Sequence, residues 1–171
     1  GAIIPDKPLD FIGRLRHPAA MTDDAKSFME LALSEAEQAA ARGEVPVGAV
    51  LVNQAGEVLA KAGNQTEKLS DPTAHAEMLV IQAATKASGS PRLENCDLYV
   101  TLEPCSMCAT AISFARVRRL YFGAFDSKGG GVEHGPKIYS QPTCHHAPEI
   151  YSGIAESRCS DLLKDFFANR R

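Results

Sequence analysis

Two short motifs that are far apart in the sequence each place metal-ligating side chains at the start of a predicted helix. His75 and Glu77 stand at the beginning of one helix, and Cys105 and Cys108 stand in the first turn of another. The two cysteines are three residues apart, so their sulfur atoms lie on the same side of their helix. If the three ligands bind one ion, the chain must bring two helix N-termini together. A sheet covered by helices provides that arrangement.

One imidazole and two thiolates form a suitable ligand set for a catalytic zinc ion, which keeps its fourth coordination position open. The start of a helix favours the thiolate form of cysteine. Glu77 follows His75 by two residues, so it can approach the open position without being a ligand. A carboxylate placed there can carry out general acid–base catalysis. The pattern is typical of zinc-dependent enzymes that deaminate nucleobases.

A closed structural zinc site is the alternative reading of the cysteine pair. Cys144, His145 or His146 could supply a fourth ligand and fill the open position. We favour a catalytic site, because a structural site would not explain Glu77 or Pro104, the proline directly before Cys105. We expect residues 144–146 to form a loop at the rim of the active site.

The composition is that of a globular protein, with 171 residues, 44% hydrophobic residues and a net charge of −3. The five cysteines are an odd number, which argues against a disulfide framework and favours a reducing, cytoplasmic location. No apolar run approaches the length of a membrane span. Gly129, Gly130 and Gly131 lack the lysine of a phosphate-binding loop, so no nucleotide cofactor is expected.

The order of predicted elements indicates an α/β fold with three layers, α/β/α, in which a mixed central sheet has helices on both faces. We expect residues 1–20 to be a disordered leader or residues added before the natural start, and residues 21–171 to form a single zinc-dependent deaminase domain. Hydrophobic periodicity and turn residues predict helices over 22–40, 74–87, 105–115 and 160–168, and strands over 45–52, 57–62, 98–102 and 120–124.

Four separated motifs resemble those of the bacterial tRNA-specific adenosine deaminases. These motifs are VPVGAV at 45–50, DPTAHAE at 71–77, TLEPC at 101–105 and FGA at 122–124 followed by Asp126. The resemblance implies a cytidine-deaminase-like fold, a homodimer and one Zn²⁺ per subunit. It also implies a tRNA anticodon stem-loop as partner, in which the wobble adenosine of an arginine tRNA is converted to inosine.

The same resemblance assigns roles by position. A zinc-bound hydroxide would attack C6 of adenine, Glu77 would be the catalytic proton shuttle, and ammonia would leave. The metal ligands would be His75, Cys105 and Cys108, and the substrate-binding residues would be Val45, Asn64, Ala76, Pro104, Asp126 and Lys128. Phe125 departs from the pattern, since a relative carries arginine there.

Two other functions fit the same scaffold. One is deamination of free bases or nucleosides, such as guanine or cytosine. The other is a small zinc-stabilised binding module without catalytic activity.

Overall fold

A computed structural model describes residues 23–170 of the chain. The expected leader at residues 1–20, Thr22 and Arg171 therefore lie outside the described residues. The elements are α1 (Asp23–Ala41), β1 (Gly48–Val52), β2 (Val58–Gly63), α2 (Ala76–Ser88), β3 (Asp97–Leu102), α3 (Ser106–Phe114), β4 (Arg119–Ala124), the 3-10 helix η2 (Ile138–Ser140), β5 (Glu149–Ser152) and α4 (Glu156–Ala168).

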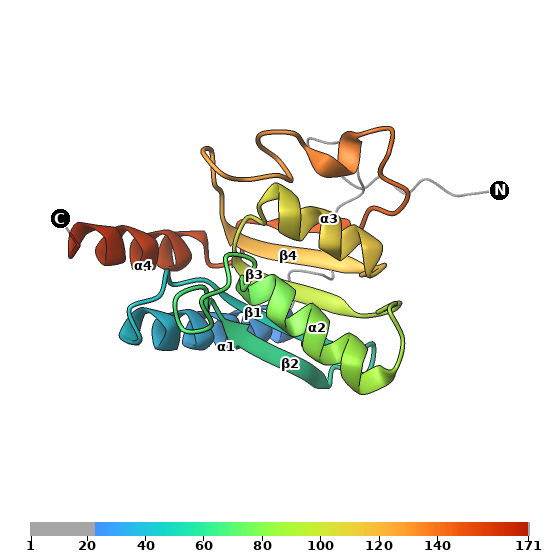
Figure 1. Cartoon of the computed structure of the whole chain (residues 1–171), viewed down its shortest axis with the longest axis horizontal. Coiled ribbons are helices and arrows are strands. Elements are labelled where there is room, and N and C mark those ends of the chain that lie inside the picture. The colour runs from blue at the N-terminus through green and yellow to red at the C-terminus, as the bar shows by residue number, and fades with distance from the viewer. Residues whose placement is uncertain (1–22, 171) are drawn as a thin grey trace.

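The five strands form one mixed sheet in the order β2-β1-β3-β4-β5. Strand β1 is antiparallel to both of its neighbours, whereas β3, β4 and β5 are parallel. Helices α2 and α3 cover one face of the sheet, and α1 and α4 pack on the other (Figure 1). The expected three-layer α/β/α fold is thus confirmed.

Strand β1 lies at the centre of the structure, and all five of its residues are buried. Ala49 and Leu51 belong to the core beneath α2 and α3, while Val50 and Val52 belong to the core beneath α1 and α4. This alternation follows from the two-residue period of a strand. The strand predicted over 45–52 is confirmed from Gly48 to Val52, and its continuous apolar run is buried on both faces.

The structure differs from the sequence prediction in three places. Strand β5 was expected to be loop, yet its four residues pair in parallel with β4. On α1, the periodicity of the helix predicted over 22–40 places Leu31 on its apolar face, but Leu31 is exposed, and Met29 and Leu33 are buried instead. Helix α4 also begins at Glu156, one turn earlier than expected.

Three tyrosines stack across neighbouring strands on the face that α1 covers. The ring centroids of Tyr99 and Tyr121 are 4.3 Å apart, and those of Tyr121 and Tyr151 are 4.9 Å apart. All three rings are buried and belong to the core that contains Met29 and Cys159. They connect β3, β4 and β5 through side-chain packing in addition to the backbone ladder.

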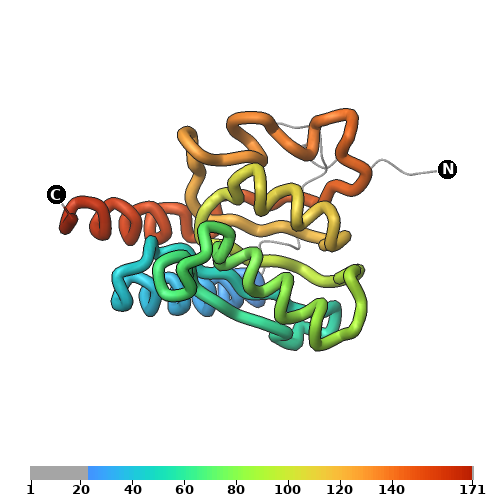
Figure 2. The backbone as a smooth tube through the Cα atoms, viewed as in Figure 1, coloured from blue at the N-terminus to red at the C-terminus, as the bar shows by residue number. Residues whose placement is uncertain are grey.

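One edge of the sheet brings together segments from the whole chain. Strand β1 begins there and β3 ends there, because the two are antiparallel and Ala49 pairs with Val100. Strand β4 ends beside β3, with Ala124 paired to Leu102. The starts of α2 and α3 lie at the same edge, next to the segment that leaves β4 (Figure 2). Ligands of α/β sheets commonly bind where strands end in this way.

Within residues 23–170, no helix is both long and apolar enough to cross a bilayer.

Candidate active site

Three potential metal ligands meet at the starts of α2 and α3. His75 is the N-cap of α2 and Cys105 is the N-cap of α3, and Cys108 lies in the first turn of α3. His75 Nδ1 is 3.6 Å from Cys105 Sγ and 3.4 Å from Cys108 Sγ. The chain thus brings together the three residues that the sequence predicted as ligands.

These distances fit a zinc ion. With Zn–S of about 2.3 Å and Zn–N of about 2.0–2.1 Å, a tetrahedral centre separates nitrogen from sulfur by about 3.6 Å. Among the described residues, no fourth histidine, cysteine or carboxylate joins the group. Three protein ligands therefore leave the fourth tetrahedral position open, which argues against the closed structural site.

The two sulfur atoms differ in their affinity for protons. Hydrogen bonds from Cys108 and then His75 lower the pKa of Cys105 to about 4. The pKa of Cys108 is raised, mainly by its hydrogen bond to Cys105 and then by burial. Hydrogen bonding to Cys105 also raises the pKa of His75. The lowered pKa of Cys105 favours its thiolate, which is the form of cysteine that ligates zinc.

Glu77 lies one residue inside α2, and only 4% of its surface is exposed. Burial raises the pKa of its carboxyl group. Glu77 lines the same cavity as His75 and Cys105, although it is not a member of the three-ligand group. A buried carboxyl group at that place can exchange protons with a molecule in the cavity.

A cavity of about 300 Å³ is lined by His75 and Cys105, and this volume is within the range of small-molecule sites. Val45 and Asn64 form part of its wall, together with Ala76 and Asp126. These are four of the six residues predicted to bind substrate. Of the other two, Pro104 is buried next to Cys105, and Lys128 lies in a neighbouring groove.

Asn64 is the polar group most clearly left for a ligand. It is 7% exposed, and its Oδ1 atom has no hydrogen-bond partner among the described residues. A buried acceptor without a donor costs about 1–3 kcal/mol. Because this atom belongs to a cavity-lining side chain, a bound molecule can supply the missing donor.

The sequence analysis did not single out several residues of the cavity wall as contacts, namely Val47, Thr66, Leu102, Glu103 and Gly129. Val47, Leu102 and Glu103 lie inside two motifs that were recognised, VPVGAV and TLEPC, so membership of these motifs was the available signal. Thr66 lies in the segment between β2 and α2, where no local pattern marks it.

The expected rim loop at residues 144–146 lies elsewhere. The hydroxyl of Ser113 donates a hydrogen bond to the carbonyl of His146, and the ring of His146 bonds to the carbonyl of Val117. Cys144 Sγ is 3.6 Å from Ser113 Oγ. These contacts hold the loop at the end of α3 that is opposite to Cys105, so the prediction of a rim loop was wrong.

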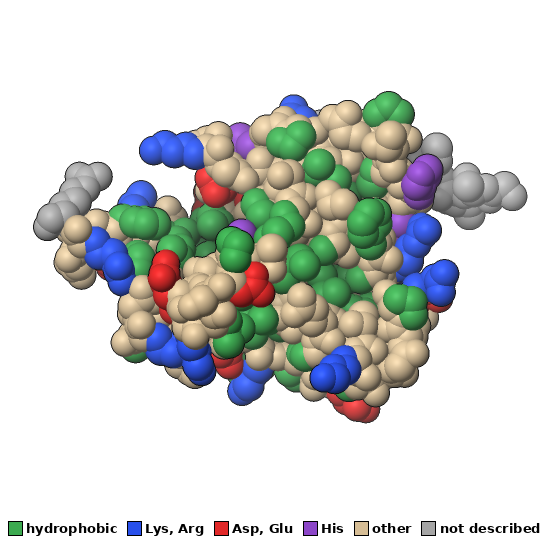
Figure 3. Space-filling view, viewed as in Figure 1, with side chains coloured by type: hydrophobic (Ala, Val, Ile, Leu, Met, Phe, Trp, Pro, Cys, Tyr) green, Lys and Arg blue, Asp and Glu red, His purple; other side chains and the backbone are tan. Residues whose placement is uncertain are grey.

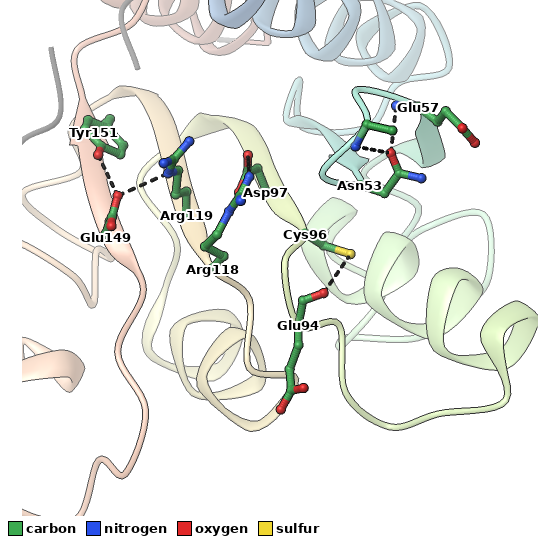
Figure 4. Close-up of polar contacts among 10 residues, drawn as sticks. Asn53, Glu57, Glu94, Cys96, Asp97, Arg118, Arg119, Glu149 and Tyr151 are labelled. Atoms are coloured by element: carbon green, nitrogen blue, oxygen red, sulfur yellow. Dashed lines mark hydrogen bonds and ion pairs between the residues drawn. The ribbon is translucent and has the colours of Figure 1, made fainter. Parts of the chain in front are cut away.

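Arg118 and Arg119 lie at the edge of the sheet that is opposite to the cavity, where β3, β4 and β5 begin (Figure 4). Arg118 donates two hydrogen bonds of 2.9 Å to the carboxylate of Asp97. Arg119 pairs with Glu149 at 3.1 Å, and the hydroxyl of Tyr151 donates to the same carboxylate. These charges are engaged in pairs away from the cavity.

The sequence model for the cytidine and deoxycytidylate deaminase zinc-binding region matches residues 22–124. This range contains the three ligands and Glu77. A guanine deaminase from Nitrosomonas europaea has the same fold, with a TM-score of 0.72 at 19% identity over 84% of each chain. The fold and the ligand group define a zinc-dependent hydrolytic deaminase with one zinc per subunit.

Closer relatives identify the branch of this class. The tRNA-specific adenosine deaminase of Agrobacterium fabrum is 61% identical over 144 residues, which are 84% of this chain and 94% of the relative. The enzyme of the same name from Bacillus subtilis is 46% identical over 151 residues, 88% of this chain and 92% of the relative. The chain belongs to the cytidine and deoxycytidylate deaminase family, in the branch of the tRNA-specific adenosine deaminases.

A solved structure gives the same result. It comes from a study of A-to-I editing by tRNA:A34 deaminases at the wobble position of transfer RNA, and it is 62% identical to this chain. The two structures align with a TM-score of 0.78 over 80% of this chain and 99% of that one.

Proposed function

We propose that this protein is a cytoplasmic enzyme that deaminates the wobble adenosine of an arginine tRNA to inosine. The observation that carries the proposal is the cavity itself, in which Asn64 and Glu77 face the same space as His75 and Cys105, two of the three metal ligands. The named relatives act on tRNA adenosine, and the identity to them covers most of both chains.

In the proposed reaction, water adds to C6 of adenine, the C6–N bond breaks, and inosine and ammonia are the products. Zinc held by His75, Cys105 and Cys108 would lower the pKa of water to about 7 and so make hydroxide available at neutral pH. Glu77 takes the proton of the water, protonates a ring nitrogen and later protonates the leaving amine. Its buried position keeps bulk water from competing for these protons.

The remaining cavity residues hold the base. Asn64 Oδ1 accepts a hydrogen bond from the base, which satisfies its buried acceptor. Val45 packs against the ring, and the backbone around Ala76 contacts the edge of the base. Pro104 fixes the start of α3 and thereby the wall beside Cys105. Asp126 lies by the ribose and backbone of the target nucleotide.

A neighbouring groove favours a polynucleotide over a free base as substrate. The groove shares Val45, Leu102 and Asp126 with the cavity, so the two are continuous. It also contains Lys128 and Lys164, together with Phe125 and Phe167, which are 40% and 50% exposed. Lysines bind phosphates and exposed aromatic rings stack on unpaired bases, as binding to an anticodon loop requires.

Arg170, near the C-terminal end of the chain, is basic but does not line the groove; it contacts other parts of the protein. Arg170 donates a hydrogen bond to the carbonyl of Gly43, and its guanidinium lies 4.2 Å from the ring centroid of Phe166. It therefore fastens the end of α4 to the end of α1, and the groove lysines remain the stronger candidates for phosphate contacts.

A homodimer through the α2/α3 face is part of the proposal. Helix α3 has no charged residue, and Phe114 at its end is 76% exposed. Hydrophobic side chains gather over both helices, with most charged side chains near the outline of this view (Figure 3). Light scattering should give twice the chain mass, and Phe114→Glu should shift the molecule toward monomer. A wild-type monomer at micromolar concentration would exclude the dimer.

The test of the substrate is incubation with a synthetic anticodon stem-loop that carries adenosine at the wobble position, with conversion to inosine read by mass. A stem-loop with guanosine at that position is the matched control, and free adenosine, guanine and cytosine are tested in parallel. Turnover of a free base without action on the stem-loop would replace the proposal with deamination of small molecules.

A further inference from the structure

Glu103 is a second buried carboxyl group at the active-site edge, and its surroundings differ from those of Glu77. Its side chain is fully buried, with 0% exposure. It directly precedes Pro104, which leads into the metal-binding helix, and its own backbone N–H donates to the carbonyl of Ala124 at the end of β4. Glu103 thus connects the ends of β3 and β4 by a backbone hydrogen bond beside the cavity wall.

Five donors converge on the two carboxylate oxygens of Glu103. Oε1 accepts from the backbone N–H of Asp126 at 3.1 Å and lies 2.7 Å from Nδ1 of His134. Oε2 accepts from the backbone N–H groups of Val132, Glu133 and His134 at 3.0–3.2 Å. All of these donors lie 23–31 residues later in the chain. A carboxylate that is saturated in this way is not available to exchange protons with substrate.

The donors belong to one loop, residues 126–134, which carries part of the cavity wall. Asp126 and Gly129 line the cavity, and Lys128 lines the adjoining groove. The loop also contacts the metal-binding helix, because the N–H of Gly131 donates to the carbonyl of Pro104 at 2.8 Å. The position of the loop relative to the zinc ligands therefore depends on the carboxylate of Glu103, which binds both ends of the loop.

The glycines of the loop show how close this contact is. A Cβ atom on Gly130 would lie 2.4 Å from Glu103 Oε2 and 2.4 Å from the carbonyl oxygen of Asp126. Such distances are far below van der Waals contact, so the loop can rest on the carboxylate only when residue 130 has no side chain. Phe125, just before the loop, makes an edge contact with the ring of His134 at 6.2 Å. The hydrogen bonds between His134 and Glu103 therefore also support Phe125, an aromatic residue that lines the groove.

We propose that Glu103 is a positioning residue, which holds the 126–134 loop against the active site so that the loop can bind the nucleotide beside the reacting base. The fully buried carboxylate of Glu103 acts through the loop and does not itself bind the substrate. The binding part of this inference rests on the proposed function, whereas the anchoring of the loop does not.

The first test is Glu103→Gln, which keeps the shape of the side chain. The amide of the glutamine has one NH₂ group, which faces backbone N–H donors of the loop whichever way the amide is turned. Two donors cannot bond to each other, so at least one end of the loop loses its hydrogen bonds. Hydrogen exchange at the amides of Asp126, Val132, Glu133 and His134 should accelerate about tenfold or more while zinc content is unchanged. On the stem-loop, KM should rise about tenfold and kcat should fall less than about threefold.

Gly130→Ala is the second variant, because it displaces the loop without changing Glu103. It should reproduce both the faster exchange and the higher KM, and it keeps the proposal testable if Glu103→Gln does not fold. Asp97→Asn at the far edge of the sheet is the control for a purely structural lesion. It should lower the melting temperature and leave KM and the four loop amides unchanged.

Several results would overturn the proposal. Faster exchange in the loop with an unchanged KM would make Glu103 a structural residue only. Loss of zinc with normal exchange in the loop would assign it to the metal-binding helix. If the wild type proves inactive on the stem-loop, the proposed function fails, but the exchange experiment still decides whether Glu103 holds the loop. The KM comparison is then made with whichever base is turned over.

Discussion

The two edges of the central sheet differ in whether every buried polar group has a partner. At the edge where β3, β4 and β5 begin, buried or half-buried charges meet opposite charges, as in the pair of Asp97 and Arg118. At the other edge, Asn64 Oδ1 is buried without a partner among the described residues, and burial raises the pKa of Glu77. Pairing stabilises the fold, whereas an unpaired buried group destabilises it until a ligand binds. The comparison shows which edge is built for stability and which for binding.

The largest expected effect is at the binding edge. Glu77→Gln removes the proton shuttle but keeps the size of the side chain, so kcat should fall by about 10²- to 10⁴-fold. Zinc content and the folded structure should be retained, as measured by metal analysis and circular dichroism. Glu94→Gln is the matched control, since Glu94 is an exposed residue at the far edge (Figure 4). A Glu77 variant with full activity would contradict a catalytic role for this edge.

The next largest effect is expected for Asn64, where a substitution should lower activity without a matching loss of stability. Asn64→Ala removes the acceptor proposed for the base, and kcat/KM should fall about 10- to 100-fold. The melting temperature should not fall in step, since the substitution also removes a buried acceptor that lacks a partner. Parallel stem-loop kinetics and thermal unfolding measure both quantities. A large drop in stability would show that Asn64 mainly supports the fold.

Asp97→Asn should give the reverse result. The substitution leaves Arg118 beside a neutral side chain. Because that arginine is about a quarter exposed, the free energy of unfolding should fall by about 2 kcal/mol, which is less than for fully buried pairs. The melting temperature should fall by roughly 4–8 °C with kcat/KM unchanged. Differential scanning calorimetry and the stem-loop assay provide the two readings. A change in KM would show that the two edges are coupled.

The smallest effect concerns the exposed pair at the same edge. Arg119→Ala breaks the pair with Glu149, whose side chain is 46% exposed, and stability should change by less than about 1 kcal/mol. Affinity for the stem-loop should not change either, because this arginine is engaged away from the cavity. Weaker binding of the stem-loop in a salt titration would instead place RNA on the far edge.

Local patterns in the sequence predicted much of the fold and the centre of the site. The spacing of His75, Cys105 and Cys108 at two helix starts was sufficient to place them around one ion, because helix geometry fixes where such side chains point. Strand β1 was predicted for a similar reason, since its continuous apolar run has to be buried on both faces.

The features that were missed depend on contacts between distant segments. Strand β5 has four residues, and only its pairing with β4 makes it a strand. The role of Glu103 is set by donors 23–31 residues away, and nothing next to it in the sequence signals them. The position of residues 144–146 depends on Ser113 and Val117, which belong to another part of the chain.

The tyrosine stack gives the protein an optical signal of its own. The chain has no tryptophan and only four tyrosines, three of which lie in the stack across β3, β4 and β5. Ultraviolet emission from this protein therefore comes mainly from closely spaced phenol rings, with no indole to absorb their energy. Separation of the parallel strands would alter that emission and the near-ultraviolet dichroism, so unfolding of the sheet can be followed without any dye or label.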